Sequence, residues 1–383
     1  MRPGSNSLTL RASNRVAVLE RIRLQAPVTR AEIARDTGLT PAAVTNIVNH
    51  LLGTGLIVEL GRRKLGRGKP AVELDLAPDG AYSIGLHLDR DVLTGVLVDL
   101  KGTSLAAVRV ELSPPSPEQA LELLAGSHAE LVATAGIDRG KLLGTGVVTV
   151  GPLDLENGTV RGPPNFPGWE NVPLRRLVQD RVGVPVILEN NATAAAIGEY
   201  WYGAGRGHRN FLYLYIGLGV GSGLFIDNHV YRGSGLNAGE VGHVHVGRGS
   251  DLFTLESLTS MLALRRDLGA AYAEPEAVAA ALQAGDAHLL EWLEGASSHL
   301  AQVLAGIDDL LDLDAVILGG RHAAEVLAHL VERTEERFRG LVMANRPRRA
   351  QLHVGRAGDD TAALGAATLP LYNAFSTLPA AVK

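Results

Sequence analysis

Polar side chains in one short segment near the start of the chain have the hydrogen-bonding groups that read DNA bases. Asn46 and Asn49 lie three residues apart, and an asparagine amide can form two hydrogen bonds with the edge of an adenine in the major groove. Thr45 can reach a base edge or a phosphate. We expect the DNA-facing residues of this segment to be Thr40, Pro41, Ala42, Thr45, Asn46 and Asn49.

A cluster of cations follows within a glycine-rich segment, GRRKLGRGKP, at residues 61–70. This composition predicts the tip of a hairpin, where lysine and arginine side chains would neutralise DNA phosphates. An arginine between two glycines, such as Arg67, is slim enough to enter a minor groove. The cations that we expect to contact DNA are Arg62, Arg63, Lys64, Arg67 and Lys69.

Short helices are predicted to hold these side chains in place. The pair Ser13-Asn14 is expected to cap a first helix that has apolar residues at helical spacing up to Ile22. Thr29 is expected to cap a second helix over residues 30–37. Glu32 lies three residues after Thr29, which is the spacing of a capping box.

A glycine turn is predicted to join the second helix to a third. Gly38 suits a backbone with positive φ, Thr40 suits an N-cap, and Pro41 suits the first helical position because its missing N–H has no partner there. The third helix is expected to end near Leu52, with Val44, Ile47, Val48 and Leu51 buried and with Ala42, Ala43, Thr45, Asn46 and Asn49 facing outward. Two helices joined in this way, followed by a basic hairpin, predict a winged helix-turn-helix DNA-binding domain over residues 1–75.

The charge of the chain is divided unevenly. Residues 1–70 hold 12 Lys and Arg against 4 Asp and Glu, whereas the remainder holds 24 against 37. A basic head on an acidic body indicates that the head is the part that meets nucleic acid. A solvated basic face without a partner would have the same composition.

Length and composition limit the other possibilities. A chain of 383 residues suits two or three domains. Apolar runs of about 18 residues, which a membrane span needs, and a signal peptide are both missing, so we expect a cytoplasmic protein. There is no cysteine, which excludes disulfides, thiolate nucleophiles and zinc sites built from cysteine.

The body, residues 80–383, alternates predicted strands and helices in two similar series, which predicts an α/β fold with two related lobes and a ligand between them. Strands are expected at 81–88, 92–99, 105–112, 143–150, 184–189, 211–216, 223–226, 315–318 and 351–354. Helices are expected at 118–135 and 192–202. Longer helices at 252–268 and 286–313 carry apolar stripes and could supply a dimer interface.

Five motifs occur in the order that is typical of one family: GRGKP at 66–70, NFPGW at 165–169, ENNA at 189–192, GLGVGSG at 217–223 and AGEVGH at 238–243. With these motifs the chain resembles the ROK family, named for repressor, open reading frame and kinase. The resemblance implies the actin-like ATPase fold of sugar kinases. It also implies that a member with a DNA-binding head is a sugar-responsive repressor of the xylose or N-acetylglucosamine type.

Compared with family kinases, the chain departs at three places that phosphoryl transfer needs. The first phosphate loop is replaced by His87–Val92, with two carboxylates where phosphate would lie, although Asp89 and Asp91 also suit a solvated turn. The second loop has Leu218 in place of a hydroxyl. The catalytic aspartate is replaced by Asn191, whose amide cannot accept a proton as a carboxylate does. We therefore predict that the protein is not an enzyme.

The sugar pocket implied by the resemblance is better preserved, and its contacts would be Asn190, Asn191, Glu240, His243 and Glu256. Trp169 suits either stacking on a sugar or core packing. The family usually follows its Gly-His with a cysteine-rich zinc site, which this chain lacks. We therefore expect no zinc and no other cofactor, with His243 held by packing or with help from His245 and Asp251.

These features together predict a transcriptional regulator of carbohydrate-metabolism genes, which binds double-stranded operator DNA as a homodimer or tetramer and responds to a sugar. Two alternatives stay open. The body could serve as a dimerisation platform for a ligand-independent regulator, or the chain could be an active sugar kinase with a DNA-binding head.

Overall fold

The computed structural model describes residues 5–63, 70–163, 166–248, 251–341, 348–357 and 360–375. The chain divides into two compact units: unit 1 holds residues 1–189 and 366–383, and unit 2 holds residues 190–365. The fold class predicted from the sequence, a winged helix-turn-helix followed by a mixed α/β body, is confirmed. Within the part of the chain that the structure describes, no helix is long and apolar enough to cross a membrane.

Unit 1 begins with a small helical layer and a three-stranded sheet of order β1-β3-β2. These elements are α1 (Ser5–Gln25), β1 (Val28–Thr29), α2 (Arg30–Thr37), α3 (Pro41–Gly53), β2 (Ile57–Arg63) and β3 (Ala71–Leu76). Helix α1 begins well before the predicted cap, so Ser13 and Asn14 lie inside it. That prediction was wrong because residues 5–12 contain no proline or glycine that would stop a helix from extending.

The rest of unit 1 is built on a five-stranded sheet of order β10-β7-β4-β5-β6. Strand β4 is almost continuously buried. Helix α4 contacts the sheet. At Gly146 of β7 a Cβ would lie 1.9 Å from the carbonyl oxygen of Ala366, so α12 packs directly on the strand backbone. The elements are β4 (Tyr82–Leu88), β5 (Val92–Asp99), β6 (Ser104–Glu111), α4 (Pro117–Ala135), β7 (Leu142–Thr149), β8 (Leu153–Asp154), β9 (Thr159–Val160), α5 (Leu174–Val182), β10 (Val186–Asn190) and α12 (Thr361–Phe375).

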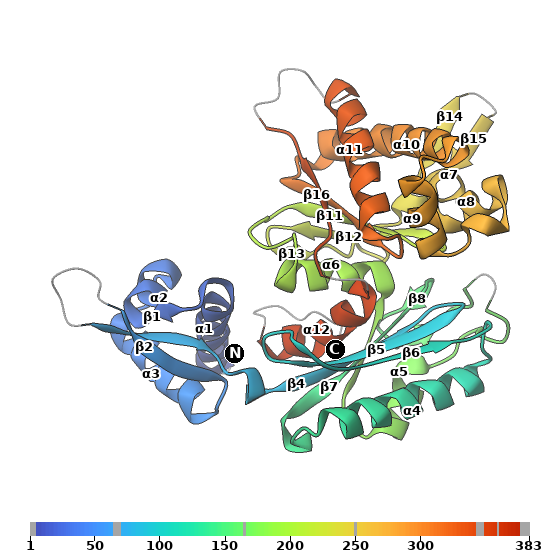
Figure 1. Ribbon diagram of the computed structural model, residues 1–383. Coiled ribbons are helices and arrows are strands. Elements are labelled where there is room, and N and C mark those ends of the chain that lie inside the picture. The colour runs from blue at the N-terminus through green and yellow to red at the C-terminus, as the bar shows by residue number, and fades with distance from the viewer. Residues whose placement is uncertain are drawn as a thin grey trace. The chain divides into compact units, whose positions relative to one another are not determined.

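Unit 2 is built on a second five-stranded sheet, of order β13-β12-β11-β16-β17. Helix α6 packs on one side of this sheet, and α10 and α11 lie on the other (Figure 1). The main elements are α6 (Asn191–Tyr202), β11 (Phe211–Ile216), β12 (Val220–Ile226), β13 (His229–Val230), β14 (His245–Arg248), β15 (Asp251–Thr254), α7 (Leu255–Thr259), α8 (Met261–Leu268), α9 (Pro275–Gln283), α10 (Ala287–Leu311), β16 (Ala315–Gly320), α11 (Ala324–Leu341) and β17 (Gln351–Val354).

The long helix predicted at 252–268 does not exist as one element. Its first residues belong to β15, and the remainder is split into α7 and α8. The split has a local cause, because the hydroxyls of Thr254 and Ser260 each accept a backbone N–H and begin a new helix. The other long helix is confirmed as α10.

Candidate functional site

The helix-turn-helix has the caps that its sequence predicts. The Thr29 hydroxyl accepts the backbone N–H of Glu32, and the Glu32 carboxylate accepts the backbone N–H of Thr29 at 2.8 Å. Gly38 ends α2 with φ of 69°, a conformation that favours glycine. The Thr40 hydroxyl then caps α3 through the N–H of Ala43 at 3.3 Å, with Pro41 in the first turn. These caps fix where α3 begins and which of its faces is exposed.

Helix α3 presents the polar face that the sequence predicted. Val44, Val48 and Leu51 are buried and Ile47 is half-buried. The Thr45 hydroxyl donates to the carbonyl oxygen of Pro41 at 2.8 Å, so in this rotamer its oxygen can only accept from a base or another donor. Of the residues expected to face outward, Ala43 is half-buried, and the exposed ones are Ala42, Thr45, Asn46 and Asn49. Thr40 and Pro41, the other two residues expected to face DNA, are exposed as well.

The wing is a hairpin of β2 and β3 that contains a bulge. The pairing shifts by one residue between Glu59 and Arg62, which places Arg63 on the same face as Glu73. Arg62 is exposed, whereas Arg63 forms ion pairs with Glu32 and Glu73. The remaining predicted wing contacts, Lys64, Arg67 and Lys69, lie outside the described residues.

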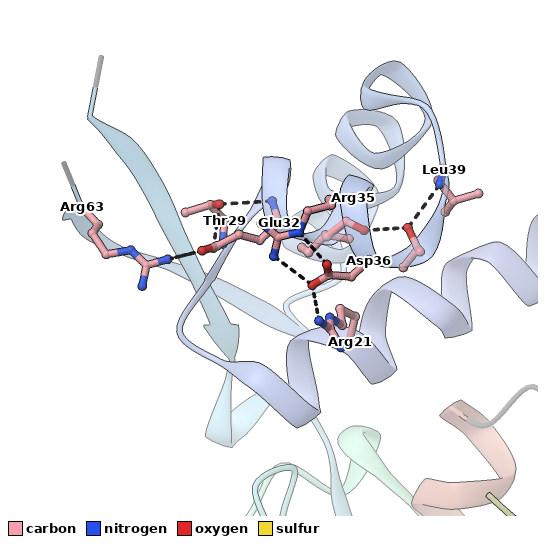
Figure 2. A network of polar contacts seen from close by, with 9 residues as sticks. Arg21, Thr29, Glu32, Arg35, Asp36, Leu39 and Arg63 are labelled. Atoms are coloured by element: carbon pink, nitrogen blue, oxygen red, sulfur yellow. Dashed lines mark hydrogen bonds and ion pairs between the residues drawn. The ribbon is translucent and has the colours of Figure 1, made fainter. Parts of the chain in front are cut away.

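A network of polar contacts joins α1, α2 and the β2 strand of the wing (Figure 2). Asp36 of α2 binds Arg21 of α1 and its own neighbour Arg35. Hydrogen bonds lower the pKa of Asp36, with the bond from Arg35 contributing more than the bond from Arg21. The pKa of Glu32 is also lowered, chiefly by the hydrogen bond from the backbone N–H of Thr29. Both carboxylates are therefore charged at neutral pH.

The five predicted sugar contacts all belong to unit 2. Two of them open α6: the Asn190 side-chain oxygen caps the helix through the N–H groups of Ala192 and Thr193, at 2.9 and 3.3 Å. Asn191, in the first turn, is 7 % exposed, and its side-chain oxygen accepts the same Ala192 N–H at 2.9 Å. The residue that replaces the kinase base is thus held against the helix N-terminus.

Glu256 of α7 reaches the glycine-rich segment. Its Oε2 accepts the backbone N–H of Val220 at 2.8 Å, and a Cβ at Gly219 would lie 2.4 Å from that oxygen. The next glycines serve packing, because a Cβ at Gly223 would lie 2.4 Å from the Ala196 Cβ of α6. This segment therefore needs glycine for reasons of close packing, independently of any phosphate.

Glu240 and His243 lie at either end of a short 3-10 turn, Val241–His243. Their side chains are 54 % and 72 % exposed, with 3.8 Å between Oε2 and Nε2. The turn is fixed against β12, because a Cβ at Gly242 would lie 2.1 Å from the Val220 carbonyl oxygen. The elements that carry the predicted contacts, α6, this turn and α7, therefore all pack against the beginning of β12.

The segment predicted to replace the first phosphate loop, His87–Val92, runs from the end of β4 to the first residue of β5. His87 is buried, and Asp89 is buried too, with its Oδ1 accepting the N–H of Arg90 at 2.8 Å. The expectation of a solvated turn was therefore wrong for Asp89, although Asp91 is half-exposed. Sequence could not show that the neighbouring backbone covers this carboxylate. Leu218, in the second loop, is half-buried at a tight turn.

Trp169 belongs to the core of unit 1. It is fully buried, and its indole N–H donates to the carbonyl oxygen of Pro115 at 2.8 Å. Its ring meets the edge of Phe166 at 5.5 Å between centroids. Of the two roles considered for Trp169, the structure supports core packing. Asn165 of the same motif lies outside the described residues.

The hairpin of β14 and β15 follows His243 in the sequence, where the family resemblance predicted a zinc-binding segment that this chain lacks. Its register pairs His245 with Thr254 and Arg248 with Asp251, so His245 and Asp251 stand three positions, or about 10 Å, apart along the strands. The suggestion that both help to hold His243 is therefore not supported. Within the described ranges, no group of three or more histidine, aspartate or glutamate side chains could hold a metal ion.

Comparison with known proteins gives a consistent result. The model of the ROK family matches residues 83–372. The chain is 32 % identical to the xylose repressor of Bacillus spizizenii over 61 % of this chain, and it spans 60 % of the length of that repressor. It is also 32 % identical to the glucokinase of Thermotoga maritima, over 48 % of this chain and 65 % of the glucokinase.

A solved structure of a ROK family transcriptional regulator, a homologue of the Escherichia coli MLC protein, has a similar fold. Its TM-score is 0.76, at 23 % identity, and the match covers 96 % of this chain and 98 % of that one. At this identity the likeness concerns the fold alone. The predicted actin-like, sugar-kinase type of body is confirmed.

Proposed function

The chain belongs to the ROK family, and on that premise we propose that it is a sugar-responsive, DNA-binding repressor of carbohydrate-metabolism genes. One observation carries the proposal: a winged helix-turn-helix with an exposed, polar and uncharged helix face precedes a body of this family. A face of this kind suits the major groove, where amides and hydroxyls read base edges. Such a regulator would act in the cytoplasm, where the bacterial chromosome lies.

In this proposal residues 1–75 bind DNA and residues 80–383 bind the effector. The contacts to operator DNA come from the exposed α3 residues, from Thr40 and from the predicted wing cations that no carboxylate holds, such as Arg62. Two copies of the chain would place two α3 helices on a palindromic operator. A sugar with different affinities for two arrangements of the dimer would change the affinity for the operator.

The effector would be a sugar that binds Asn190, Asn191, Glu240, His243 and Glu256. Amides, carboxylates and imidazole are the donors and acceptors that hydroxyl groups require. Binding without turnover follows from Asn191, which can hydrogen-bond a sugar hydroxyl but cannot take its proton. We therefore propose a body that senses the sugar and does not phosphorylate it.

Gel-shift titration of genomic fragments tests this function, first alone and then with D-xylose, D-glucose and N-acetylglucosamine. We expect a subset of fragments to be retained at moderate salt and to be released by a sugar. Asn46→Ala with Asn49→Ala should abolish the selectivity, whereas Arg176→Ala, an exposed arginine of α5, should not. Retention of all fragments alike would contradict sequence-specific binding, and selective binding that no sugar changes would favour the platform alternative.

An active kinase is the second candidate, because the Thermotoga maritima glucokinase is a relative at 32 % identity. A coupled ADP-release assay over the same sugars decides between the two. The proposed repressor shows no turnover above a protein-free control. Turnover that Glu240→Ala abolishes would establish a kinase with a DNA-binding head.

A further inference from the structure

Arg63 is the wing cation whose surroundings set it apart. Its Nη2 lies 2.7 and 2.8 Å from the two carboxylate oxygens of Glu32, and its Nε lies 3.1 Å from Oε1 of Glu73. One guanidinium thus joins the last residue of β2 to the beginning of α2, through Glu32 (Figure 2), and to β3, through Glu73. Arg62, its neighbour on the same strand, is exposed.

Glu32 performs two tasks with one carboxylate. Its Oε2 accepts both the backbone N–H and the hydroxyl of Thr29 at 2.8 Å, which closes the capping box of α2. Both of its oxygens accept from Arg63. Because Thr29 pairs directly with Glu73 in the sheet, the arginine lies between two neighbouring carboxylates.

Moving Arg63 to a DNA phosphate would therefore have a cost that moving Arg62 would not. The departure would leave Glu32 and Glu73 facing each other without the cation between them, and like charges at this range repel. Glu32 and Glu73 are also the better shielded partners, with side chains 23 % and 18 % exposed against 40 % for Arg63. Shielding from water strengthens the attraction that holds the arginine.

We propose that Arg63 is a positioning residue of the wing, which Glu32 and Glu73 hold against α2, and that phosphate contact belongs to exposed neighbours such as Arg62. This assignment rests on the proposed DNA-binding function. A second pair of opposite polarity, Arg30 of α2 with Glu59 of β2 at 2.9 Å, joins the same two elements. Together the two pairs fix how β2 lies along the helix that precedes the recognition helix.

The test uses the full chain and a fluorescent 30-base-pair duplex of mixed sequence, with affinity measured at 50 and 200 mM KCl. The double variant Glu32→Gln, Arg63→Met keeps the net charge of the chain. If Arg63 makes no phosphate contact, the double variant keeps the salt dependence of the wild type, so its affinity should be lower by the same factor at both salt concentrations. The matched control, Arg62→Met, loses a phosphate contact, so its defect should shrink about 3.5-fold over that range, since each contact contributes a salt slope of about 0.9. A defect of the double variant that shrinks like that of Arg62→Met would overturn the proposal.

Amide exchange in β2 and β3 gives a reading that does not depend on DNA. Loss of the Arg63 contacts should speed exchange there about two- to fivefold, as expected for a partly exposed ion pair, and Arg62→Met should not. Glu32→Gln alone still has a side-chain oxygen that can accept the N–H of Thr29, so α2 should stay capped. It should show most of the increase in exchange rate, and it serves as a second variant if the double variant folds poorly. Unchanged exchange would overturn the proposal, even if the wild-type chain failed to bind DNA and the proposed function fell with it.

Discussion

The carboxylate of Glu256 accepts the backbone N–H of Val220, with 2.8 Å between Oε2 and N. This bond joins α7 to the first residue of β12, and Gly219, in the turn before β12, leaves no room for a side chain beside the carboxylate. One glycine of a repeat that resembles a phosphate cradle, Gly219, is therefore required here by a neighbouring glutamate. Glu256, a predicted sugar contact, is thus held by the glycine turn, so a substitution at either place should disturb the other.

Gly219→Ala is expected to remove sugar binding while leaving DNA binding intact. A Cβ placed 2.4 Å from Oε2 must displace the Glu256 carboxylate, which is the mobile end of its side chain. The cost to stability is the lost hydrogen bond to Val220, about 0.5–1.5 kcal/mol. Thermal unfolding with and without the sugar that stabilises the wild type measures both effects. Gly295→Ala, inside α10 with nothing within 4 Å of its Cβ, is the control and should raise stability by about 0.5–1 kcal/mol. A full sugar shift in Gly219→Ala would show that Glu256 does not contact the sugar.

Thr40 and Thr45 should separate stability of the head from recognition. The Thr40 hydroxyl caps α3, so Thr40→Ala should cost about 1 kcal/mol of stability. The Thr45 hydroxyl only donates back to its own helix, so Thr45→Ala should leave stability unchanged within about 0.5 kcal/mol and weaken DNA binding. Denaturant unfolding and gel shifts on the same two variants make the comparison. Equal losses of stability would mean that Thr45 also supports the fold of the head.

Local signals were read correctly from the sequence. The caps at Thr29 and Thr40 and the bounds of β5, β11 and β17 depend on residues a few positions apart, and the structure agrees with each of them. The beginning of α1 was misplaced at Ser13, because no proline or glycine between residues 5 and 12 stops the helix from extending toward the N-terminus. At 252–268 the apolar spacing hid the caps at Thr254 and Ser260, although both hydroxyls are visible in the sequence.

Contacts between distant residues were beyond the sequence. Arg63 and Glu32 are 31 residues apart. Gly61 lies within the bulge of β2 and is its one local mark in the sequence, but it does not show that the arginine would meet Glu73. The burial of Trp169 likewise involves a distant segment, because its indole N–H reaches the carbonyl oxygen of Pro115. The predicted sugar contacts came from family motifs, and only the structure shows that their elements share β12 as a support.

His322 should make unit 2 sensitive to acid. It is 5 % exposed, neither ring nitrogen has a hydrogen-bond partner among the described residues, and burial followed by the charge of Arg321 lowers its pKa to about 4. The folded protein favours the neutral form of His322, whereas the unfolded chain binds a proton at a pKa of about 6.5. The free energy of unfolding is therefore highest above about pH 6.5 and decreases as the pH falls toward 4. Urea unfolding at pH 7.5 and pH 5 should record this loss.

The variant His322→Leu removes the titrating group from a site of similar volume. It should be more stable than the wild type by about 1 kcal/mol at pH 7.5, because an unpaired buried polar group is replaced by an apolar one. The difference should widen at pH 5. His288→Leu, in the first turn of α10 and exposed, is the control and should leave the pH dependence unchanged. A gap that stays constant with pH would mean that His322 is not the group responsible.

Asn191→Asp tests whether one amide is all that separates this body from a kinase. The side chain lies in the first turn of α6, where its oxygen already accepts a backbone N–H, and a carboxylate near a helix N-terminus is favourable by about 0.3–1 kcal/mol. Burial opposes this gain, because Asn191 is only 7 % exposed and burial disfavours a charged group. The variant should therefore fold with a stability close to that of the wild type. We expect it still to show no ADP release with any of the sugars, because the segment that the family resemblance assigns to phosphate, His87–Val92, holds a buried carboxylate at Asp89, and a carboxylate repels phosphate. Measuring thermal stability beside turnover separates a folded, silent variant from a damaged one. Turnover restored by this single change would place the loss of activity in Asn191 alone and would make the phosphate loops of this chain competent.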